Sequence, residues 1–377
     1  MSIRQYNLGS IVKPGFNPLA TQTPIYTYYL YSWGANSFGE LGLGNTTSYS
    51  SPKQVGSLTT WATITGQNNA TFSIKTDGTM WAWGRGAGGR LGLNNTTYYS
   101  SPKQIGALTT WSTVDGGQNF CAAIKTDGTL WSWGVNSSGQ LGDGTIVNKS
   151  SPVQIGALTT WSKVSAGGEH CLAIKTDGTL WSWGAGASGC LGLGNITNYS
   201  SPKQVGALTN WASIVAGAES ISYAIKTDGT WWSWGANSDG ALGLGNTTAY
   251  SSPKQLGALT NWSVASEIYR GAMAIKTDGA LWMWGRNNKG QLGQNNTTYR
   301  SSPVQVGALT TWLRIAGSNY TATAIKTDGT WWTWGDNTSG QLGLGNTTDY
   351  SSPKQVGSLT TWAFAARNTN GTIALGY

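Results

Sequence analysis

Residues that could carry out chemistry are few in this chain. Of its 377 residues only one is a histidine, His170, and 15 are aspartate or glutamate. A catalytic or metal site needs several titratable or ligating side chains that converge in one cleft. Six of the aspartates instead recur singly, about fifty residues apart, in Lys-Thr-Asp-Gly segments: Asp77, Asp127, Asp177, Asp228, Asp278 and Asp328.

Aspartates dispersed in this way cannot act as a pair of catalytic carboxylates. The Asp-X-Asp spacing of calcium loops is also absent. We therefore expect no catalytic residue, no metal and no cofactor, and we predict that the protein is not an enzyme. His170 follows Gly167-Gly168-Glu169, and we favour a structural role for it, although it also belongs to a varied set of positions considered below.

The three cysteines do not suggest a disulfide framework. Cys121 and Cys171 occupy the same position in adjacent repeats. Stacked sheets would hold them about 10 Å apart, beyond the ~7 Å between Cα atoms that a disulfide allows. Cys190 has no counterpart. We predict three free thiols, the first two as small buried residues.

The net charge of +8 could indicate a nucleic-acid partner, but the lysines are spread out. Eleven of the fifteen fall in two repeated segments, Lys-Thr-Asp-Gly and Ser-Pro-Lys-Gln. Such lysines form a dilute ring, so no nucleic-acid partner is expected. No apolar run approaches the ~18 residues of a membrane span, and the N-terminus shows no secretory pattern. We expect no membrane insertion.

A repeat of 50 or 51 residues is the dominant feature along the chain. A Trp-X-Trp-Gly segment, with Tyr in the first copy, ends at seven glycines: Gly34, Gly84, Gly134, Gly184, Gly235, Gly285 and Gly335. A Ser-Pro pair follows each copy, and a Leu-Thr-X-Trp segment follows that. Repeats of this period are typical of propellers and other arrays.

One unit predicts four strands. Residues 111–115 and 120–125 form the first two, Thr126-Asp127-Gly128 is a tight turn, and 129–133 forms the third. Residues 151–155 form an outer strand, where proline is tolerated at an edge. Four short antiparallel strands match one propeller blade. No helical pattern of useful length occurs.

The ends of the chain are complementary halves of one blade. The first copy lacks the Lys-Thr-Asp-Gly turn, and the residues after Trp362 stop where that turn would begin. We predict that Thr372–Gly376 pairs with Leu30–Gly34 and closes the ring, which removes both sheet edges. The fold class is therefore all-β: a seven-bladed β-propeller over residues 25–377, preceded by an extended arm over residues 1–24 that serves for attachment or as a linker.

All 22 tryptophans fall in the Trp-X-Trp segments, beside them, or in the Leu-Thr-X-Trp segments. Aromatic side chains that recur in register bury large areas between stacked sheets. We predict that they form the core, with carbohydrate stacking as the alternative for one or two of them.

These segments carry a family resemblance. Residues 164–184 (Val-Ser-Ala-Gly-Gly-Glu-His-Cys-Leu-Ala-Ile-Lys-Thr-Asp-Gly-Thr-Leu-Trp-Ser-Trp-Gly) and 188–192 (Ser-Gly-Cys-Leu-Gly) resemble repeats of the regulator of chromosome condensation family. The resemblance implies a seven-bladed propeller closed by terminal strands. Some members are exchange factors for a small GTPase, but this chain lacks their inserted hairpin and acidic surface. The near-identical copies and the segment Asn17-Pro18-Leu19-Ala20 also resemble phage virion-associated propellers.

Two positions vary between otherwise uniform copies, and varied positions are the best places to look for binding. One follows the first strand of each copy and the other follows Trp-X-Trp-Gly. We expect both on one face of the disc, with a composition typical of interfaces; neutral drift in exposed loops is the alternative. The candidate binding residues are Arg85, Asn119, Phe120, Glu169, His170, Glu219, Tyr269, Arg270, Arg286, Asn319 and Tyr320.

Two functions follow as hypotheses. The first is a non-enzymatic structural or adsorption protein of a phage virion, such as a decoration, fibre or tail-associated propeller. One disc face would bind other virion proteins, a host-surface receptor or a glycan. The alternative is a soluble, cytoplasmic platform or inhibitor that docks a cellular protein.

Overall fold

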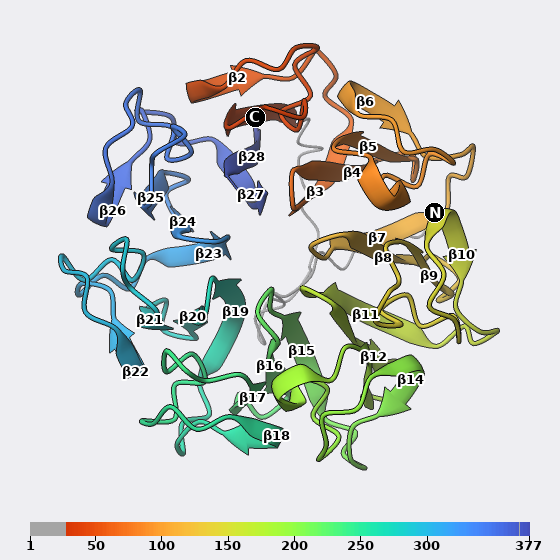
Figure 1. The fold of residues 1–377 in the computed structure, drawn as a ribbon. Helices are drawn as coiled ribbons and strands as arrows, with labels where there is room; N and C mark the ends of the chain where they lie inside the picture. Colours follow the sequence, from red (N-terminus) through yellow and green to blue (C-terminus); the bar gives the residue numbers. More distant parts are fainter. Residues whose placement is uncertain (1–27, 369) are drawn as a thin grey trace, which may run out of the picture.

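The computed structural model describes residues 28–368 and 370–377. The predicted arm over residues 1–24 lies outside the described residues. Seven four-stranded antiparallel sheets are arranged in a ring around a central axis, as Figure 1 shows. This confirms the predicted seven-bladed propeller with four strands per blade.

The two strands nearest the axis of the ring in each blade form one hairpin. The innermost strands are β3 (Trp61–Gln67), β7 (Trp111–Gly116), β11 (Trp161–Ala166), β15 (Trp211–Ala216), β19 (Trp262–Ile268), β23 (Trp312–Gly317) and β27 (Trp362–Asn368). The second strands are β4 (Ala70–Lys75), β8 (Phe120–Lys125), β12 (His170–Lys175), β16 (Ile221–Lys226), β20 (Gly271–Lys276), β24 (Thr321–Lys326) and β28 (Gly371–Gly376).

The two outer strands complete each blade. The third strands are β1 (Tyr29–Gly34), β5 (Met80–Gly84), β9 (Leu130–Gly134), β13 (Leu180–Gly184), β17 (Trp231–Gly235), β21 (Leu281–Gly285) and β25 (Trp331–Gly335). The outermost strands are β2 (Tyr49–Gln54), β6 (Tyr99–Gln104), β10 (Lys149–Gln154), β14 (Tyr199–Gln204), β18 (Tyr250–Gln255), β22 (Arg300–Gln305) and β26 (Tyr350–Gln355). In residues 111–155, the unit for which four strands were predicted, the observed strand bounds differ from the predicted bounds by at most two residues.

Ring closure follows the predicted pairing. The sheet order β2-β1-β28-β27 combines the two ends of the chain in one blade. Leu30 pairs with Leu375 and Trp33 with Thr372, and the ladder extends one pair further at each end, from Tyr29 to Gly34. Neither β1 nor β28 therefore remains an unpaired edge.

The Lys-Thr-Asp-Gly turns have a side-chain network of their own. Asp77 accepts hydrogen bonds from the backbone N–H and the hydroxyl of Thr79, at 2.9 and 2.7 Å. The Thr79 hydroxyl oxygen accepts one from the indole N–H of Trp81 at 2.9 Å. Gly78 supplies the positive φ of +79° that the tight turn requires. Five of the six turns carry this chain of bonds; in the sixth, Ala280 replaces the threonine.

The tryptophans form the core, as predicted. The second tryptophan of each Trp-X-Trp pair is fully buried and donates its indole N–H to a backbone carbonyl of the preceding blade. Trp83 bonds to the carbonyl of Glu40 at 3.0 Å, and Trp133 bonds to that of Arg90 at 2.9 Å. The same contact closes the ring, where Trp33 reaches Gln341 at 3.1 Å. Each pair of blades is thus joined by a buried hydrogen bond as well as by aromatic packing. Cys121, Cys171 and Cys190 are all free and buried.

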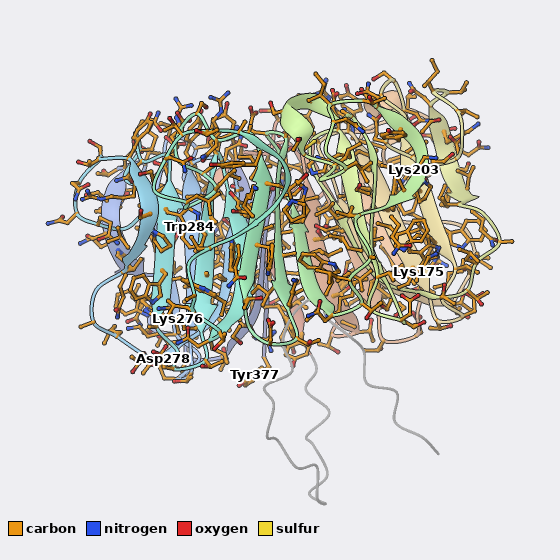
Figure 2. The ribbon with its side chains drawn as sticks, turned by 90° about the horizontal axis from the view of Figure 1, so that it is seen from below. Lys175, Lys203, Lys276, Asp278, Trp284 and Tyr377 are labelled. Carbon is orange, nitrogen blue, oxygen red and sulfur yellow. The ribbon has the colours of Figure 1, made fainter. Side chains whose placement is uncertain are left out.

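The disc has two faces of different character. The Lys-Thr-Asp-Gly turns and the C-terminal Tyr377 share one face, which we name the turn face; Figure 2 shows Asp278 and Tyr377 on that side. The loops that join each innermost strand to the second strand lie at the opposite ends of the strands. We name that side the varied face.

Candidate binding face

Both varied positions lie on the varied face, because the backbone connects them blade by blade. The residue after each Trp-X-Trp-Gly donates its N–H to the carbonyl of the residue just before the second strand. Arg85 bonds to Asn69 at 2.8 Å, Arg286 to Arg270 at 3.0 Å and Asp336 to Tyr320 at 2.9 Å. Since this bond uses no side chain, residue types at both positions can change without loss of the fold.

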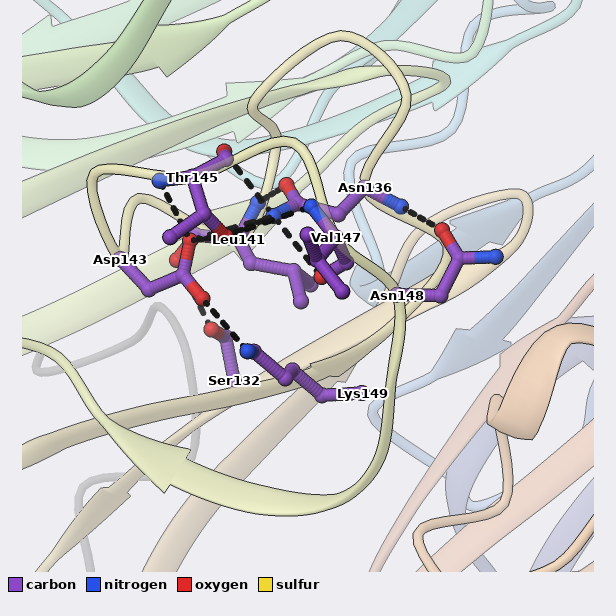
Figure 3. A network of polar contacts seen from close by, with 8 residues as sticks. All are labelled: Ser132, Asn136, Leu141, Asp143, Thr145, Val147, Asn148 and Lys149. Atoms are coloured by element: carbon purple, nitrogen blue, oxygen red, sulfur yellow. Dashed lines mark hydrogen bonds and ion pairs between the residues drawn. The ribbon is translucent and has the colours of Figure 1, made fainter.

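In five blades, a buried asparagine directly after the second varied position holds the loop that follows. Figure 3 shows one such loop: the Asn136 side chain accepts from the N–H of Leu141 at 2.9 Å and donates to the carbonyls of Thr145 and Val147 at 3.1 and 3.2 Å. Its own N–H donates to Asn148 at 2.8 Å. Asn36, Asn237, Asn287 and Asn337 occupy the same position and are buried. Gly86 and Gly186 replace it in the other two blades, where single 3-10 turns follow at Ala87–Gly89 and Ala187–Gly189.

Charged residues from four loops of two neighbouring blades meet on one part of the varied face. Arg270 contacts the carboxylates of Glu219 at 3.3 Å and Asp239 at 3.6 Å. Arg286 contacts Asp239 from the other side at 3.8 Å. The two carboxylates belong to one blade and the two arginines to the next, and their charges balance one another. Arg270 has a positive φ of +53°, a strained conformation for a residue that carries a side chain.

Two tyrosines extend this group toward the next blade. The rings of Tyr269 and Tyr320 have centroids 4.8 Å apart. The Arg286 guanidinium lies over both rings, at 5.4 and 5.7 Å, and that of Arg270 lies 5.4 Å from Tyr269. Burial raises the pKa of Tyr320, with Tyr269 adding to the effect, so the phenol stays neutral at physiological pH. We name Glu219, Asp239, Tyr269, Arg270, Arg286 and Tyr320 the Tyr–Arg cluster.

Five of the eleven predicted candidates therefore belong to one cluster. The sequence did not indicate Asp239, which the two arginines share. A neighbouring contact was also missed: Lys289 pairs with Asp336 and with Asp349, both at 3.2 Å. The residue type at the position of Asp336 differs between copies, and that variation was the only sequence signal for this residue.

The candidate binding role of Phe120 and His170 is a correction, whereas the structural role favoured for His170 agrees with its position. Both side chains are buried, with exposures of 0% and 1%, so neither lies on an exposed face. Each is the first residue of a second strand and pairs with the glycine that follows Trp-X-Trp, Gly134 and Gly184. That position points into the core. The His170 ring nitrogen Nε2 lies 3.0 Å from the Ser222 hydroxyl, and burial lowers the pKa of His170 to about 4.

The remaining candidates lie apart from the Tyr–Arg cluster. Arg85 lies 5.1 Å over the ring of Phe38, which packs edge-on against Tyr98. Glu169 is exposed and accepts a hydrogen bond from Ser138 at 3.0 Å. Asn119 is half-buried.

A cavity of about 180 Å³ lies on the varied face, where the ends of the innermost strands surround the axis of the ring. Gly116, Ala166 and Ala218 supply part of its wall, and Asn319 and Tyr269 line it next to the cluster. Glu267 also lines it and accepts a hydrogen bond from the Ala218 N–H at 2.7 Å. Burial raises the pKa of Glu267 to about 8, with the charges of Asp115 and Glu219 adding to the effect. Sequence reasoning gave no signal for this residue.

The described residues contain no group of three or more His, Cys, Asp or Glu side chains that could hold a metal ion. Within the same part of the chain, no helix is long and apolar enough to cross a membrane.

The architecture defines the class of protein, a closed seven-bladed propeller of four-stranded repeats. The regulator of chromosome condensation (RCC1) repeat matches residues 29–71, 77–124, 127–174, 177–223, 228–266, 278–325 and 328–366. A second form of this repeat matches residues 111–140 and 161–190. The chain belongs to the RCC1 repeat family.

Solved structures of the same fold are distant in sequence. Yeast RCC1 (Prp20) bound to Kap60 superposes with a TM-score of 0.83 at 18% identity, over 93% of this chain and 89% of that chain. Prp20p from Saccharomyces cerevisiae gives 0.81 at 19% identity, over 93% and 92%. Human WBSCR16 gives 0.81 at 20% identity, over 93% and 98%. No curated protein sequence matches the chain. None of these matches supports the expected resemblance to phage virion proteins.

Proposed function

We propose that this protein is a non-enzymatic platform that binds another protein through its varied face, with the Tyr–Arg cluster as the main contact. The observation that carries the proposal is the concentration of two tyrosines and two arginines at one place on a ring of otherwise uniform blades. Tyrosine and arginine are enriched where interfaces gain most of their binding energy. The cluster is also partly exposed, with 35% of the Arg270 side chain accessible.

The balance of charges within the cluster favours a protein partner over a nucleic acid. Both arginines already contact carboxylates, so they present no uncompensated positive patch to a phosphate backbone. The hydrogen-bonding edges of their guanidinium groups and the faces of the tyrosine rings can still be buried against a partner. Among the structural relatives, yeast Prp20p is described with binding to Gsp1p and histones, and Prp20 was solved with Kap60. Those partners support protein binding as the class of function, and they identify no partner for this chain.

Catalysis has little support in the chemistry of the described residues. The single histidine is buried, with its pKa lowered to about 4, and it lies against Ser222 in the core. The turn aspartates accept hydrogen bonds from their own turns, which stabilises the hairpins. Binding without catalysis therefore remains our proposal.

The experiment is a capture assay with the immobilised protein, followed by mass spectrometry of what it retains. Tyr269→Ala combined with Tyr320→Ala should reduce retention of a specific partner at least tenfold, because two anchor side chains are lost. Leu158→Ala and Leu208→Ala, which remove exposed side chains from connections on the turn face, serve as the matched control. Retention lost equally in both double variants, or in neither, would contradict the proposal.

Association with a phage particle remains a prediction. Density-banded virions analysed by mass spectrometry would test it directly: stoichiometric presence of the chain would make a virion component the partner of the varied face. Its absence would leave a cellular protein as the partner to seek.

A further inference from the structure

Glu267 lacks a cationic partner among the described residues. It lies near the end of β19 and lines the cavity of about 180 Å³ on the varied face. The ion pairs formed between described residues all join other side chains. The charges that act on Glu267 are those of Asp115 and Glu219, which are also negative. A bound cation would stabilise a carboxylate in this setting.

The two neighbouring carboxylates are already engaged. Glu219 contacts Arg270 at 3.3 Å. The oxygens of Asp115 accept hydrogen bonds of 3.0 to 3.2 Å from two hydroxyls and two backbone N–H groups. Glu267, by contrast, accepts a single hydrogen bond from the described residues, from the Ala218 N–H to Oε2 at 2.7 Å.

The second oxygen of Glu267, Oε1, is open to a ligand. No described residue donates a hydrogen bond to it, yet it is not one of the buried polar atoms that lack a partner. Oε1 is therefore accessible, in keeping with the partial exposure of the residue as a whole. Because Glu267 lines the cavity, a ligand reaches Oε1 from there.

Gln118 supplies a second acceptor to the same cavity. Its side-chain amide N–H donates to the carbonyl of Ala218, two blades away, at 3.2 Å. Its own side-chain oxygen receives no hydrogen bond from the described residues, and it too is absent from the buried atoms that lack a partner. At the position of Glu267, the other innermost strands that line the cavity carry only Gly66, Gly116, Ala166 and Gly317. These small residues leave room for a ligand.

We propose that this cavity binds the ammonium group of one lysine side chain of the protein partner, with Glu267 as its counter-ion. The inference rests on the proposed function, which makes a protein the source of the lysine. A cavity of about 150 Å³ can hold a benzene ring, so this one can hold the end of a lysine side chain. The ammonium group donates to Oε1 of Glu267 and to the side-chain oxygen of Gln118.

The geometry favours an ammonium group over a guanidinium group. A guanidinium binds a carboxylate best through two parallel hydrogen bonds, one to each oxygen. Oε2 of Glu267 already accepts from Ala218, whereas an ammonium group is a compact charge that one oxygen can pair with. Tyr269 lines the cavity and also belongs to the Tyr–Arg cluster. Residues that flank the lysine in the partner can therefore contact the cluster in the same complex.

Binding should depend on pH in a defined direction. Burial raises the pKa of Glu267 to about 8, and the charges of Asp115 and Glu219 add to this. The other titratable groups beside it are the phenols of Tyr269, which lines the cavity, and of Tyr223, whose own pKa burial raises. Below pH 8 the free protein holds a proton on Glu267, and the ammonium group must displace it. Affinity should therefore rise with pH and level off above pH 8, since lysine stays charged to about pH 10.

The test is isothermal titration calorimetry of the intact protein with Nα-acetyl-lysine N-methylamide, to about 50 mM because a single ammonium group binds weakly. We expect the affinity to increase about tenfold from pH 6 to pH 7. The norleucine analogue, which has the same length but no charge, should not bind. The arginine analogue should bind more weakly than the lysine analogue.

Glu267→Gln keeps the shape of the side chain and removes its charge. It should weaken binding of the lysine analogue at least tenfold and abolish the dependence on pH. Asp278→Asn is the matched control, because it removes one exposed carboxylate on the turn face. Arg367 holds the position of Glu267 in the seventh copy, so Arg367→Gln is tested as well and should bind as the parent protein does.

Four outcomes would overturn the inference: equal binding of the norleucine analogue, tighter binding of the arginine analogue, affinity that rises toward low pH, and binding that appears only in Arg367→Gln. The capture assay separates the inference from the proposed function. Partner retention that is lost in the Tyr269→Ala and Tyr320→Ala variant but kept in Glu267→Gln would overturn the lysine site alone. Lysine binding without any specific partner retained by the parent protein would overturn the proposed function and leave the ammonium site standing.

Discussion

The turn face and the varied face are built from opposite ends of the same strands, yet the sequence treats them differently. On the turn face each blade repeats one set of contacts. The turn lysine lies over the half-buried tryptophan of its own blade at 3.8 Å in Lys75, 3.5 Å in Lys125 and 3.6 Å in Lys175. On the varied face, neighbouring blades differ at the same two positions, and side chains from different blades contact one another.

The difference shows which positions of the blade depend on side chains. Turns on the turn face are held by the aspartate, threonine and tryptophan of each copy. On the varied face, the two varied positions are joined by backbone hydrogen bonds such as Arg286 to Arg270, while the buried asparagine holds the loop that follows in five blades. A position that is held by its backbone can acquire new side chains at little cost in stability.

The largest effect is expected on the turn face, from Gly78→Ala. A Cβ there would overlap the carbonyl oxygen of Thr109 and would require a φ of +79° from an alanine. We expect a loss of about 3 kcal/mol in the free energy of unfolding, measured by urea denaturation. Gly56→Ala is the control, since its φ is +62° but no atom lies within 4 Å of the added carbon. It should cost about 1 kcal/mol. Equal losses would show that the close approach to Thr109 is unimportant.

A smaller effect is expected at the cavity on the varied face that Glu267 lines. The folded protein holds the proton of Glu267 up to a pKa of about 8, whereas the unfolded chain releases it near 4.5. Between these values the folded state binds the extra proton, so its stability falls as the pH rises. Glu267→Gln should abolish this decline, so the variant should gain stability relative to the parent protein as the pH rises from 5 to 8. Urea denaturation at pH 5 and pH 8 tests this; an identical pH dependence in both proteins would contradict it.

The smallest effect is expected within the Tyr–Arg cluster. Arg270→Gly relieves the positive φ but removes two partly exposed ion pairs, each of which contributes little. We expect the free energy of unfolding to change by less than about 1 kcal/mol, while partner retention falls. Thermal denaturation and the capture assay measure the two quantities. A large loss of stability would end the distinction between the two faces, because it would show that varied side chains also hold the fold.

The fold was predictable because periodicity alone determines it. Seven copies of Trp-X-Trp-Gly, together with the missing turn in the first copy, indicate the blade number and the closure between β1 and β28. The position of the varied face followed from the same alignment of copies.

The site was predictable only in part. Phe120 and His170 lie at the border between a loop and a strand, and the sequence does not reveal that their pairing with Gly134 and Gly184 directs them inward. Asp239 is 31 positions from Arg270, and only the three-dimensional arrangement of neighbouring blades brings the two together. The pKa of Glu267 depends on burial by other blades, which no local pattern reports.

Closure of the ring also has a consequence for biosynthesis. Strand β1 is among the first parts of the propeller to leave the ribosome, but its partner β28 emerges more than three hundred residues later. At the usual rates of synthesis, β1 waits roughly 20 to 70 s for the strand that covers it. During that time the nascent chain displays an open edge, which is a template for pairing with other chains. Crowded polysomes should therefore be the setting in which this protein is most exposed to misassembly.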